Sequence, residues 1–415
     1  MPLQKNQVLT LRVERLSSDG SGVAHSPDGE TVFIPGAAPG DEARVRIVKD
    51  CKRYAFGILD EVLTPSPDRI PVDCAVAGPC GGCSLRHLDY AAELRAKQEN
   101  VADAFARIGG LDVPVLPIVG SPEVNRYRNK VQFPVGVDKS GKPCIGFYAG
   151  RTHRIVPCPD CRLQPGVLNE IGNALCAFFA EKGIQPYSEE TGRGLVRHIF
   201  LRRGAHSGQI MVCLVCTRAR LPSAEELCTR LKAQFAEITT ILLNVNAKNT
   251  NVILGTETHT LYGPGYIEDT LCGVPVQLGP LSFYQVNTLA AEQLYGIAAQ
   301  YAQLTPDDLL LDLYCGMGTI SLSMAAHCRE LIGVEIVPEA IESAKANAAR
   351  MGADVAAKSR FFCADAGQAA TRLAAEGLHP DIVMLDPPRK GCDEATLSAV
   401  VRMAPRRVVY VSCNP

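Results

Sequence analysis

The sequence predicts a multidomain α/β protein that ends in a doubly wound parallel sheet. From about Val276 onward, apolar strands alternate with helical stretches, which is the pattern of such a sheet. The first sixty residues differ, because short alternating strands there are separated by turns rich in Gly and Pro. The chain has 415 residues, 47% hydrophobic and 21% charged without a repeating period, which argues against disorder, collagen and coiled coil.

The N-terminal region, residues 1–63, is predicted to be a small β-barrel. Leu9, Leu11 and Val13 alternate with polar residues, and Val45 and Ile47 do the same, so each set marks a half-buried strand. A five-stranded OB-like barrel fits this pattern and often binds single-stranded nucleic acid, although a generic small β domain fits it equally well.

The central region, residues 64–275, is predicted to mix helices and strands around a group of cysteines. Its apolar strands are expected at 209–216 and 239–245. Apolar residues recur at helical spacing over 87–108, which predicts an amphipathic helix that we expect to pack on the C-terminal domain. The function of this region is not apparent from the pattern alone.

The C-terminal domain, residues 276–415, is predicted to be a Rossmann-like sheet. Its strands are expected at Leu309–Leu313, Leu331–Glu335, Arg360–Ala364, Asp381–Leu385 and Arg407–Ser412.

A glycine turn directly after the first of these strands is the candidate cofactor loop. Gly316 and Gly318 allow the backbone to approach a ligand closely. Glu335 ends the second strand, 19 residues beyond Gly316, where a carboxylate accepts hydrogen bonds from ribose hydroxyls. Asp365 and Asp386 end the next two strands. Because the third glycine of G-x-G-x-x-G is missing, the loop favours S-adenosylmethionine over a dinucleotide; an incidental glycine turn is the alternative.

Cys413 follows the last strand, at the edge of the sheet where the cofactor is expected. A thiolate is a strong nucleophile, and the cations of Arg389 and Lys390 are placed to lower its pKa. Oxygen and nitrogen acceptors need no enzyme nucleophile for methylation, whereas C5 of a pyrimidine becomes nucleophilic only after a thiolate adds to C6. The cysteine therefore points to carbon methylation; taken alone, a cysteine at a strand end is more often structural.

The motifs together resemble the bacterial RNA uracil-5-methyltransferases, most closely the 23S rRNA members with a TRAM barrel and an iron–sulfur cluster. They are Phe283 to Asn287, Asp312 to Gly318, Asp386-Pro387-Pro388-Arg389 and Ser412-Cys413-Asn414-Pro415. The resemblance implies Cys413 as the nucleophile. It also implies a cofactor and uracil pocket lined by Gln285, Tyr314, Gly316, Gly318, Thr319, Glu335, Asp365 and Asp386. Thr319 is a departure, since some relatives have Asn there.

A cluster of cysteines offers ligands for a metal site. Cys74, Cys80 and Cys83 supply three thiolates, and Cys158 or Cys161 could supply a fourth. The resemblance favours Cys161 and implies a [4Fe–4S] cluster, but the spacing leaves a four-cysteine zinc site open. Ten other cysteines are expected to be packing residues: Cys51, Cys144, Cys176, Cys213, Cys216, Cys228, Cys272, Cys328, Cys363 and Cys392.

Two basic stretches are candidate RNA contacts, although a solvated face is the default interpretation of any charge run. Eight basic residues face three acidic ones within 121–162, interleaved with Tyr127, Phe133, Phe147 and Tyr148, which could stack on unpaired bases. The second stretch is Arg193, Arg197, Arg202 and Arg203.

We expect a cytoplasmic monomer with RNA as partner and no membrane association. The chain has 17 cysteines without an apolar leader, which favours a reducing compartment, and no apolar run reaches the roughly 18 residues that cross a bilayer. The resemblance also implies that the chain is truncated at Pro415, before the carboxylate that removes the C5 proton. A non-catalytic RNA-binding factor and a tRNA uracil-5-methyltransferase are the alternatives.

Overall fold

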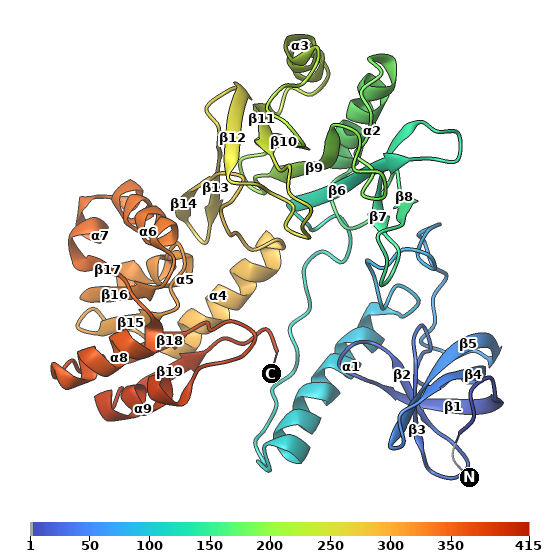
Figure 1. Cartoon of the computed structure of the whole chain (residues 1–415). Coiled ribbons are helices and arrows are strands. Elements are labelled where there is room, and N and C mark those ends of the chain that lie inside the picture. Colours follow the sequence, from blue (N-terminus) through green and yellow to red (C-terminus); the bar gives the residue numbers. More distant parts are fainter. Residues whose placement is uncertain (1–2, 415) are drawn as a thin grey trace. The chain divides into compact units, whose positions relative to one another are not determined.

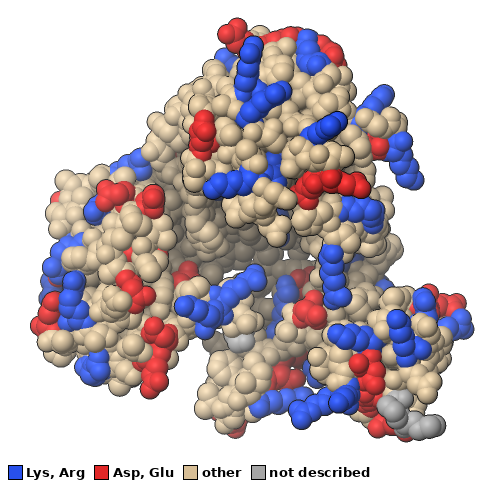
Figure 2. Space-filling view, viewed as in Figure 1, with Lys and Arg blue, Asp and Glu red and all other residues tan. Residues whose placement is uncertain are grey.

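The computed structural model describes residues 3–414 and divides into two compact units (Figure 1). The first comprises Met1–Val124 and Gly146–Cys158, and the second comprises Asn125–Ile145 and Pro159–Pro415. Among the described residues, no helix has both the length and the apolar character needed to cross a bilayer. Basic and acidic side chains are interspersed over the face seen in Figure 2.

The first unit begins with a closed barrel of five strands, in the order β1-β2-β3-β5-β4. The strands are β1 (Val8–Leu16), β2 (Gly22–His25), β3 (Thr31–Ile34), β4 (Glu42–Asp50) and β5 (Tyr54–Thr64). The alternating apolar residues face the interior, as the sequence pattern predicts: Leu11, Val13, Val45 and Ile47 are all buried in the barrel core.

The helix of the first unit is α1 (Tyr90–Asp103), which continues into one π-helical turn, η1 (Ala104–Ile108). It therefore begins three residues later than the sequence pattern predicts. Its buried Ala96 joins Leu16 of the barrel in a small apolar cluster. Because this buried face contacts the barrel, its packing on the C-terminal domain stays a prediction.

The second unit contains most of a mixed sheet in the order β12-β11-β10-β9-β6-β7-β8. The strands are β6 (Lys130–Val137), β7 (Pro143–Tyr148), β8 (Ile155–Pro157), β9 (Val196–Arg203), β10 (Ile210–Cys216), β11 (Ile238–Val245) and β12 (Glu257–Tyr262). The end of β7 and all of β8 fall in the first unit. Within the second unit, α2 (Gly166–Glu181) and α3 (Ala224–Gln234) pack against the sheet.

The C-terminal part of the second unit is a parallel sheet in the order β17-β16-β15-β18-β19. Its strands are β15 (Leu309–Leu313), β16 (Glu330–Glu335), β17 (Ser359–Cys363), β18 (Ile382–Leu385) and β19 (Arg407–Tyr410). These bounds agree with the sequence prediction to within two residues. The order places β15 in the centre, so the carboxyl ends of β15, β16 and β18 meet at one edge.

Helices cover both faces of the parallel sheet (Figure 1). They are α4 (Thr288–Ala302), α5 (Thr319–Ser323), α6 (Pro338–Met351), α7 (Ala353–Lys358), α8 (Ala366–Ala375) and α9 (Glu394–Met403), with a 3-10 turn η2 (Ala325–His327). On one face, Leu311 and Leu313 pack with α8 and α9. On the other face, a larger core includes Leu310 and extends through the hairpin of β13 (Ile267–Leu271) and β14 (Val274–Leu278) to Met211 of the mixed sheet.

Candidate active site

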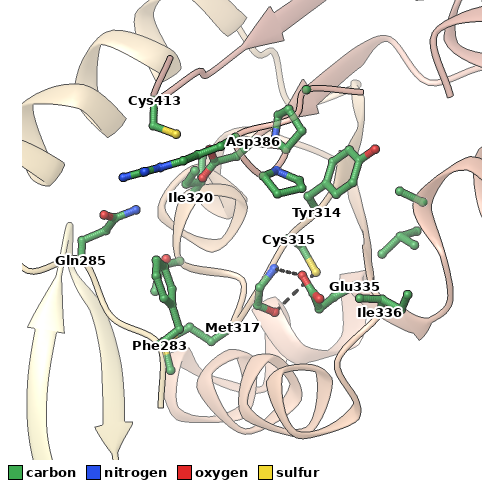
Figure 3. Close-up of a pocket in the computed structure, with 18 of the residues that line it drawn as sticks. Phe283, Gln285, Tyr314, Cys315, Met317, Ile320, Glu335, Ile336, Asp386 and Cys413 are labelled. Carbon is green, nitrogen blue, oxygen red and sulfur yellow. Dashed lines mark hydrogen bonds between the residues drawn. The ribbon is translucent and has the colours of Figure 1, made fainter. Parts of the chain in front are cut away.

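A cavity of about 680 Å³ lies at the carboxyl edge of the parallel sheet (Figure 3). The loops after β15, β16, β17 and β18 contribute to its wall, together with the segment before α4 and the residue after β19 that carries the exposed thiol. Of the sequence-predicted site residues, these line the cavity: Gln285, Tyr314, Gly316, Thr319, Glu335, Asp365, Asp386 and Cys413. Gly318 does not line it and instead precedes the first residue of α5.

The loop after β15 is a tight, left-handed turn. Gly316 and Gly318 have φ of 54° and 78°, as a glycine turn requires, but Tyr314 also has φ of 75°. A non-glycine residue in that region costs on the order of 1 kcal/mol or more and is characteristic of functional turns. The backbone amides of Tyr314 and Cys315 both donate to the Val334 carbonyl, each at 2.9 Å, which ties the loop to β16.

Glu335 is held against this loop by two backbone amides. Its Oε2 accepts from Gly316 N at 3.1 Å and its Oε1 accepts from Val337 N at 3.0 Å. Asp365 begins α8 as its N-cap and accepts from Gln368 N at 3.1 Å. The carboxylate of Glu335 lies across the cavity from Cys413 and Gln285 (Figure 3). The site therefore has an acidic end suited to hydroxyl groups and a separate end with the thiol.

Gln285 is positioned by residues of the mixed sheet. The side-chain amide of Asn129 donates to the Gln285 carbonyl at 2.7 Å and to Thr288 Oγ1 at 2.9 Å. The guanidinium of Arg202, 1% exposed, donates to the carbonyls of Gly279 and Ser282 at 2.8 and 2.7 Å. These bonds fix the segment that carries Gln285, so the mixed sheet orients one wall of the cavity.

Cys413 is the accessible thiol of the cavity. Its side chain is exposed and lines the cavity, across from Glu335 (Figure 3). Cys315 also lines the cavity, but burial together with Asp312 and Glu335 raises the pKa of its thiol, so it stays protonated. Asp386 lies nearby, where burial raises the pKa of its carboxyl. Pro415, the last residue of the predicted motif, lies outside the described residues.

Asp312 is a functional candidate that motif reading did not single out. It is the penultimate residue of β15, 1% exposed, and neither of its carboxyl oxygens has a hydrogen-bond partner among the described residues. The nearby Ser321 hydroxyl donates instead to the Gly318 carbonyl. Burial, with smaller contributions from Asp386 and Glu335, raises the pKa of Asp312 to about 7. Its position within the Asp312 to Gly318 motif was the only indication that the sequence offered.

Two apolar residues of the cavity wall were also missed as site residues. Phe283 is 75% exposed and Ile336 is 62% exposed, which is unusual for large apolar side chains on a sheet edge. Ile336 directly follows Glu335, the acidic residue that ends β16, and this position could have identified it as a site residue from the sequence. An exposed apolar wall on both sides of the loop suits the flat faces of heterocyclic bases.

The three cysteines Cys74, Cys80 and Cys83 lie on one loop of the first unit. The loop turns through bonds from Ala77 N to the Cys74 carbonyl and from Cys80 N to the Val76 carbonyl. Cys161 is a buried residue of the second unit. Over residues 3–414, no three Cys, His, Asp or Glu side chains are gathered into a group that could hold a metal ion. The four thiols are nevertheless of the donor type that a [4Fe–4S] cluster uses.

Several sequence-based interpretations of the basic and cysteine residues are wrong. Arg197 is 5% exposed and donates to the carbonyls of Asn246 and Lys248, and Arg202 is also buried, so neither contacts RNA from the surface. Phe133 is fully buried and cannot stack on a base. Cys363, expected to be a packing residue, is exposed. A short run of sequence shows the charge of a residue but not which face of the strand it occupies.

Comparisons with known proteins agree with this geometry. Residues 206–415 match the family model described as tRNA (uracil-5-)-methyltransferase, and residues 2–59 match the TRAM domain. An uncharacterized RNA methyltransferase of Halalkalibacterium halodurans is 42% identical over 415 residues, which are 100% of this chain and 90% of that protein. One of Oceanobacillus iheyensis is 40% identical over 416 residues, covering 100% and 89%.

A solved structure is similar over nearly the whole chain. It is the Pyrococcus abyssi tRNA (uracil-54, C5)-methyltransferase in complex with S-adenosyl-L-homocysteine, with a TM-score of 0.76 and 25% identity, covering 98% of this chain and 91% of that one. The mixed α/β architecture and the TRAM domain are thus confirmed. This chain belongs to the tRNA (uracil-5-)-methyltransferase family and is an S-adenosylmethionine-dependent RNA (uracil-5-)-methyltransferase.

Proposed function

We propose that this enzyme methylates C5 of a uridine in 23S rRNA through a covalent bond between Cys413 and uracil C6. The observation that carries the proposal is that an exposed thiol and an acidic, loop-bound end share one cavity. S-adenosylmethionine, when bound, supplies an electrophilic methyl group. The two ends of the cavity are suited to the nucleoside of the cofactor and to the uracil.

The proposed chemistry starts with addition of the Cys413 thiolate to C6, which moves the C5–C6 π electrons onto C5 and O4 as an enolate. C5 then bonds to the methyl carbon as the methyl–sulfur bond breaks. Removal of the C5 proton by a base and expulsion of the thiolate restore the uracil ring. A uridine in structured RNA has to be flipped out of its stack to reach the thiol. We assign Gln285, on the thiol side of the cavity, to the uracil.

We assign Glu335, Asp365 and the loop from Tyr314 to Thr319 to the cofactor, with Gly318 shaping the turn and Asp386 lying between cofactor and base. We expect Glu335→Gln to weaken S-adenosylhomocysteine binding about tenfold, because one charge-assisted acceptor for a ribose hydroxyl is lost. Isothermal titration calorimetry measures the change. The control is Glu330→Gln, on the same strand but paired with Arg360 outside the cavity. Equal affinities of the two variants would contradict the assignment.

The RNA target is tested by methyl transfer from radiolabelled S-adenosylmethionine to transcripts. We expect the enzyme to label 23S rRNA fragments, with the label recovered as 5-methyluridine. The second candidate is tRNA, which is favoured by the similarity to the Pyrococcus abyssi tRNA (uracil-54, C5)-methyltransferase. Label that appears in tRNA transcripts and not in 23S rRNA would overturn the rRNA target and keep the chemistry.

We also propose a [4Fe–4S] cluster bound by Cys74, Cys80, Cys83 and Cys161, with no part in the chemical step. Four thiolates are the usual ligands of such clusters. The guanidinium of Arg86 lies near the thiols of Cys74 and Cys83; despite burial, its pKa is raised by Asp73 and, less strongly, by these two thiols. Anaerobic purification should give a brown protein with about four irons per chain. A colourless protein with one zinc would contradict the cluster.

A further inference from the structure

Three aromatic rings gather on the outer surface of the N-terminal barrel. Phe33 projects from β3, and Tyr54 and Phe56 project from β5. The ring centroids of Phe33 lie 5.7 Å from Tyr54 and 5.8 Å from Phe56, and those of Tyr54 and Phe56 lie 5.6 Å apart. We call these three residues the aromatic platform.

The strand pairing explains why the rings meet outside the barrel. β3 and β5 are parallel neighbours in which Phe33 lies opposite Phe56. Val32, which precedes Phe33, and Ala55, which separates Tyr54 from Phe56, are both 0% exposed and belong to the barrel core. Because successive side chains of a strand alternate between faces, the aromatic residues must point away from the core. The rings are therefore not needed to fill the barrel.

The platform remains accessible in the structure of this unit. Tyr54 is 39% exposed, and Phe33 and Phe56 are half-buried. Single exposed apolar residues are common on protein surfaces, but a contiguous aromatic group marks an interaction site. Two of the three ring pairs are edge-to-face, with interplanar angles of 79° and 87°, so ring faces stay available for stacking.

The charge beside the platform is positive. The end of β4 and the turn into β5 carry Lys49, Lys52 and Arg53, and the one acid there, Asp50, accepts from the backbone amide of Lys52 at 2.7 Å. Farther along the same strands, arginines are neutralised by ion pairs, as Arg46 is by Asp60. The three cations at the turn have no ion pair with any residue from 3 to 414. Aromatic rings beside uncompensated cations form the usual binding surface for single-stranded nucleic acid.

We propose that the aromatic platform stacks on an unpaired base of the substrate RNA, with the neighbouring phosphates at Lys49, Lys52 and Arg53. The proposal rests on RNA being the substrate, but it concerns a site distinct from the catalytic cavity. It assigns to the barrel a stacking function that tolerates different bases, because every base has a π face. Methyl transfer itself does not require the platform.

Fluorescence offers a direct test because the chain contains no tryptophan. We expect Tyr54→Trp fluorescence to be quenched saturably by a ten-nucleotide oligoadenylate, and much less by a duplex RNA of the same length. The matched control is Ile58→Trp, on the same outer face of β5 but outside the ring cluster. Equal quenching at both positions, or equal quenching by duplex RNA, would overturn the proposal. The titration is performed with the Cys413→Ala variant, so that its result does not depend on whether Cys413 is the catalytic nucleophile.

Steady-state kinetics provide an independent test. Stacking on one base is worth about 1 to 3 kcal/mol, so Phe33→Ala with Phe56→Ala should raise KM for a long transcript about tenfold with kcat within twofold. Ile58→Ala should leave both constants unchanged, and thermal unfolding should confirm that the barrel is folded. A fall in kcat at unchanged KM would contradict stacking. Self-association that the ring substitutions abolish, without any RNA quenching, would assign the surface to a second copy of the chain.

Discussion

Replacing Cys413 by alanine is expected to abolish the covalent adduct with RNA that contains 5-fluorouridine. In that RNA, fluorine replaces the C5 proton, so a base cannot complete the elimination and the protein remains bound through sulfur. Without the thiolate, C5 is not nucleophilic, and methyl transfer to ordinary RNA should fall by about 10⁴-fold or more. Denaturing electrophoresis measures the adduct, and single-turnover methyl transfer measures the rate. Calorimetry should show unchanged binding of S-adenosylhomocysteine.

Cys363 provides the matched control for this experiment. Cys363 and Cys413 are the two cysteines among residues 3–414 that the structure shows as exposed, but Cys363 does not line the cavity. We expect Cys363→Ala to form the adduct at the rate of the parent enzyme. An adduct that persists in Cys413→Ala, or that disappears in Cys363→Ala alone, would show that another thiol is the nucleophile.

Asp312→Asn is expected to stabilise the ligand-free protein above neutral pH. The folded-state pKa of Asp312, about 7, lies above its unfolded value of 3.8, so the folded protein binds the additional proton between these pH values. The stability from that proton is present below about pH 4 and is lost as the pH rises through 7. By linkage, the parent loses about 4 kcal/mol of its free energy of unfolding over this range. The amide of the Asp312→Asn variant does not ionise, so the variant should not show this loss.

Urea unfolding from pH 4.5 to pH 8.5 measures this difference in the free energy of unfolding. The difference between the parent and Asp312→Asn should be smallest at pH 4.5, where the folded parent keeps its carboxyl neutral, and should grow toward pH 8.5. Asp307→Asn is the control, because Asp307 is exposed just before the same strand. If the free energy of unfolding changes with pH equally in the parent and in Asp312→Asn, the prediction is wrong. The Asp312 carboxyl is then either charged at all these pH values or hydrated.

The parallel sheet was predictable because its strands are short apolar runs, each of which ends at residues that interrupt the apolar pattern. Glu335 ends a buried strand and Asp386 directly follows one. Parallel order necessarily brings such ends to one edge, so these carboxylates of the cavity could be identified from the sequence. Cys413 was found by the same argument. Their roles stay predictions, because lining a cavity is not the same as binding a ligand.

Other parts of the site depend on contacts between distant residues and were not predictable. Asn129 and Arg202 hold the segment of Gln285 through bonds that span about 80 to 160 residues of sequence, counted from the residue numbers. Arg202 was interpreted as a surface cation because its neighbours in sequence are basic. Whether a strand residue faces the core depends on the elements that pack on the sheet, and no local pattern carries that information.

The shared core of the second unit has a consequence for how this enzyme can be dissected. Apolar residues of the mixed sheet, such as Met211, and of the parallel sheet, such as Leu310, belong to one continuous cluster. A fragment that starts near Val276 would lose one side of that cluster and expose the rest to water. The two sheets should therefore melt in a single cooperative transition. A fusion of the parallel-sheet domain to another RNA-binding module should therefore fold only if the mixed sheet is included in it.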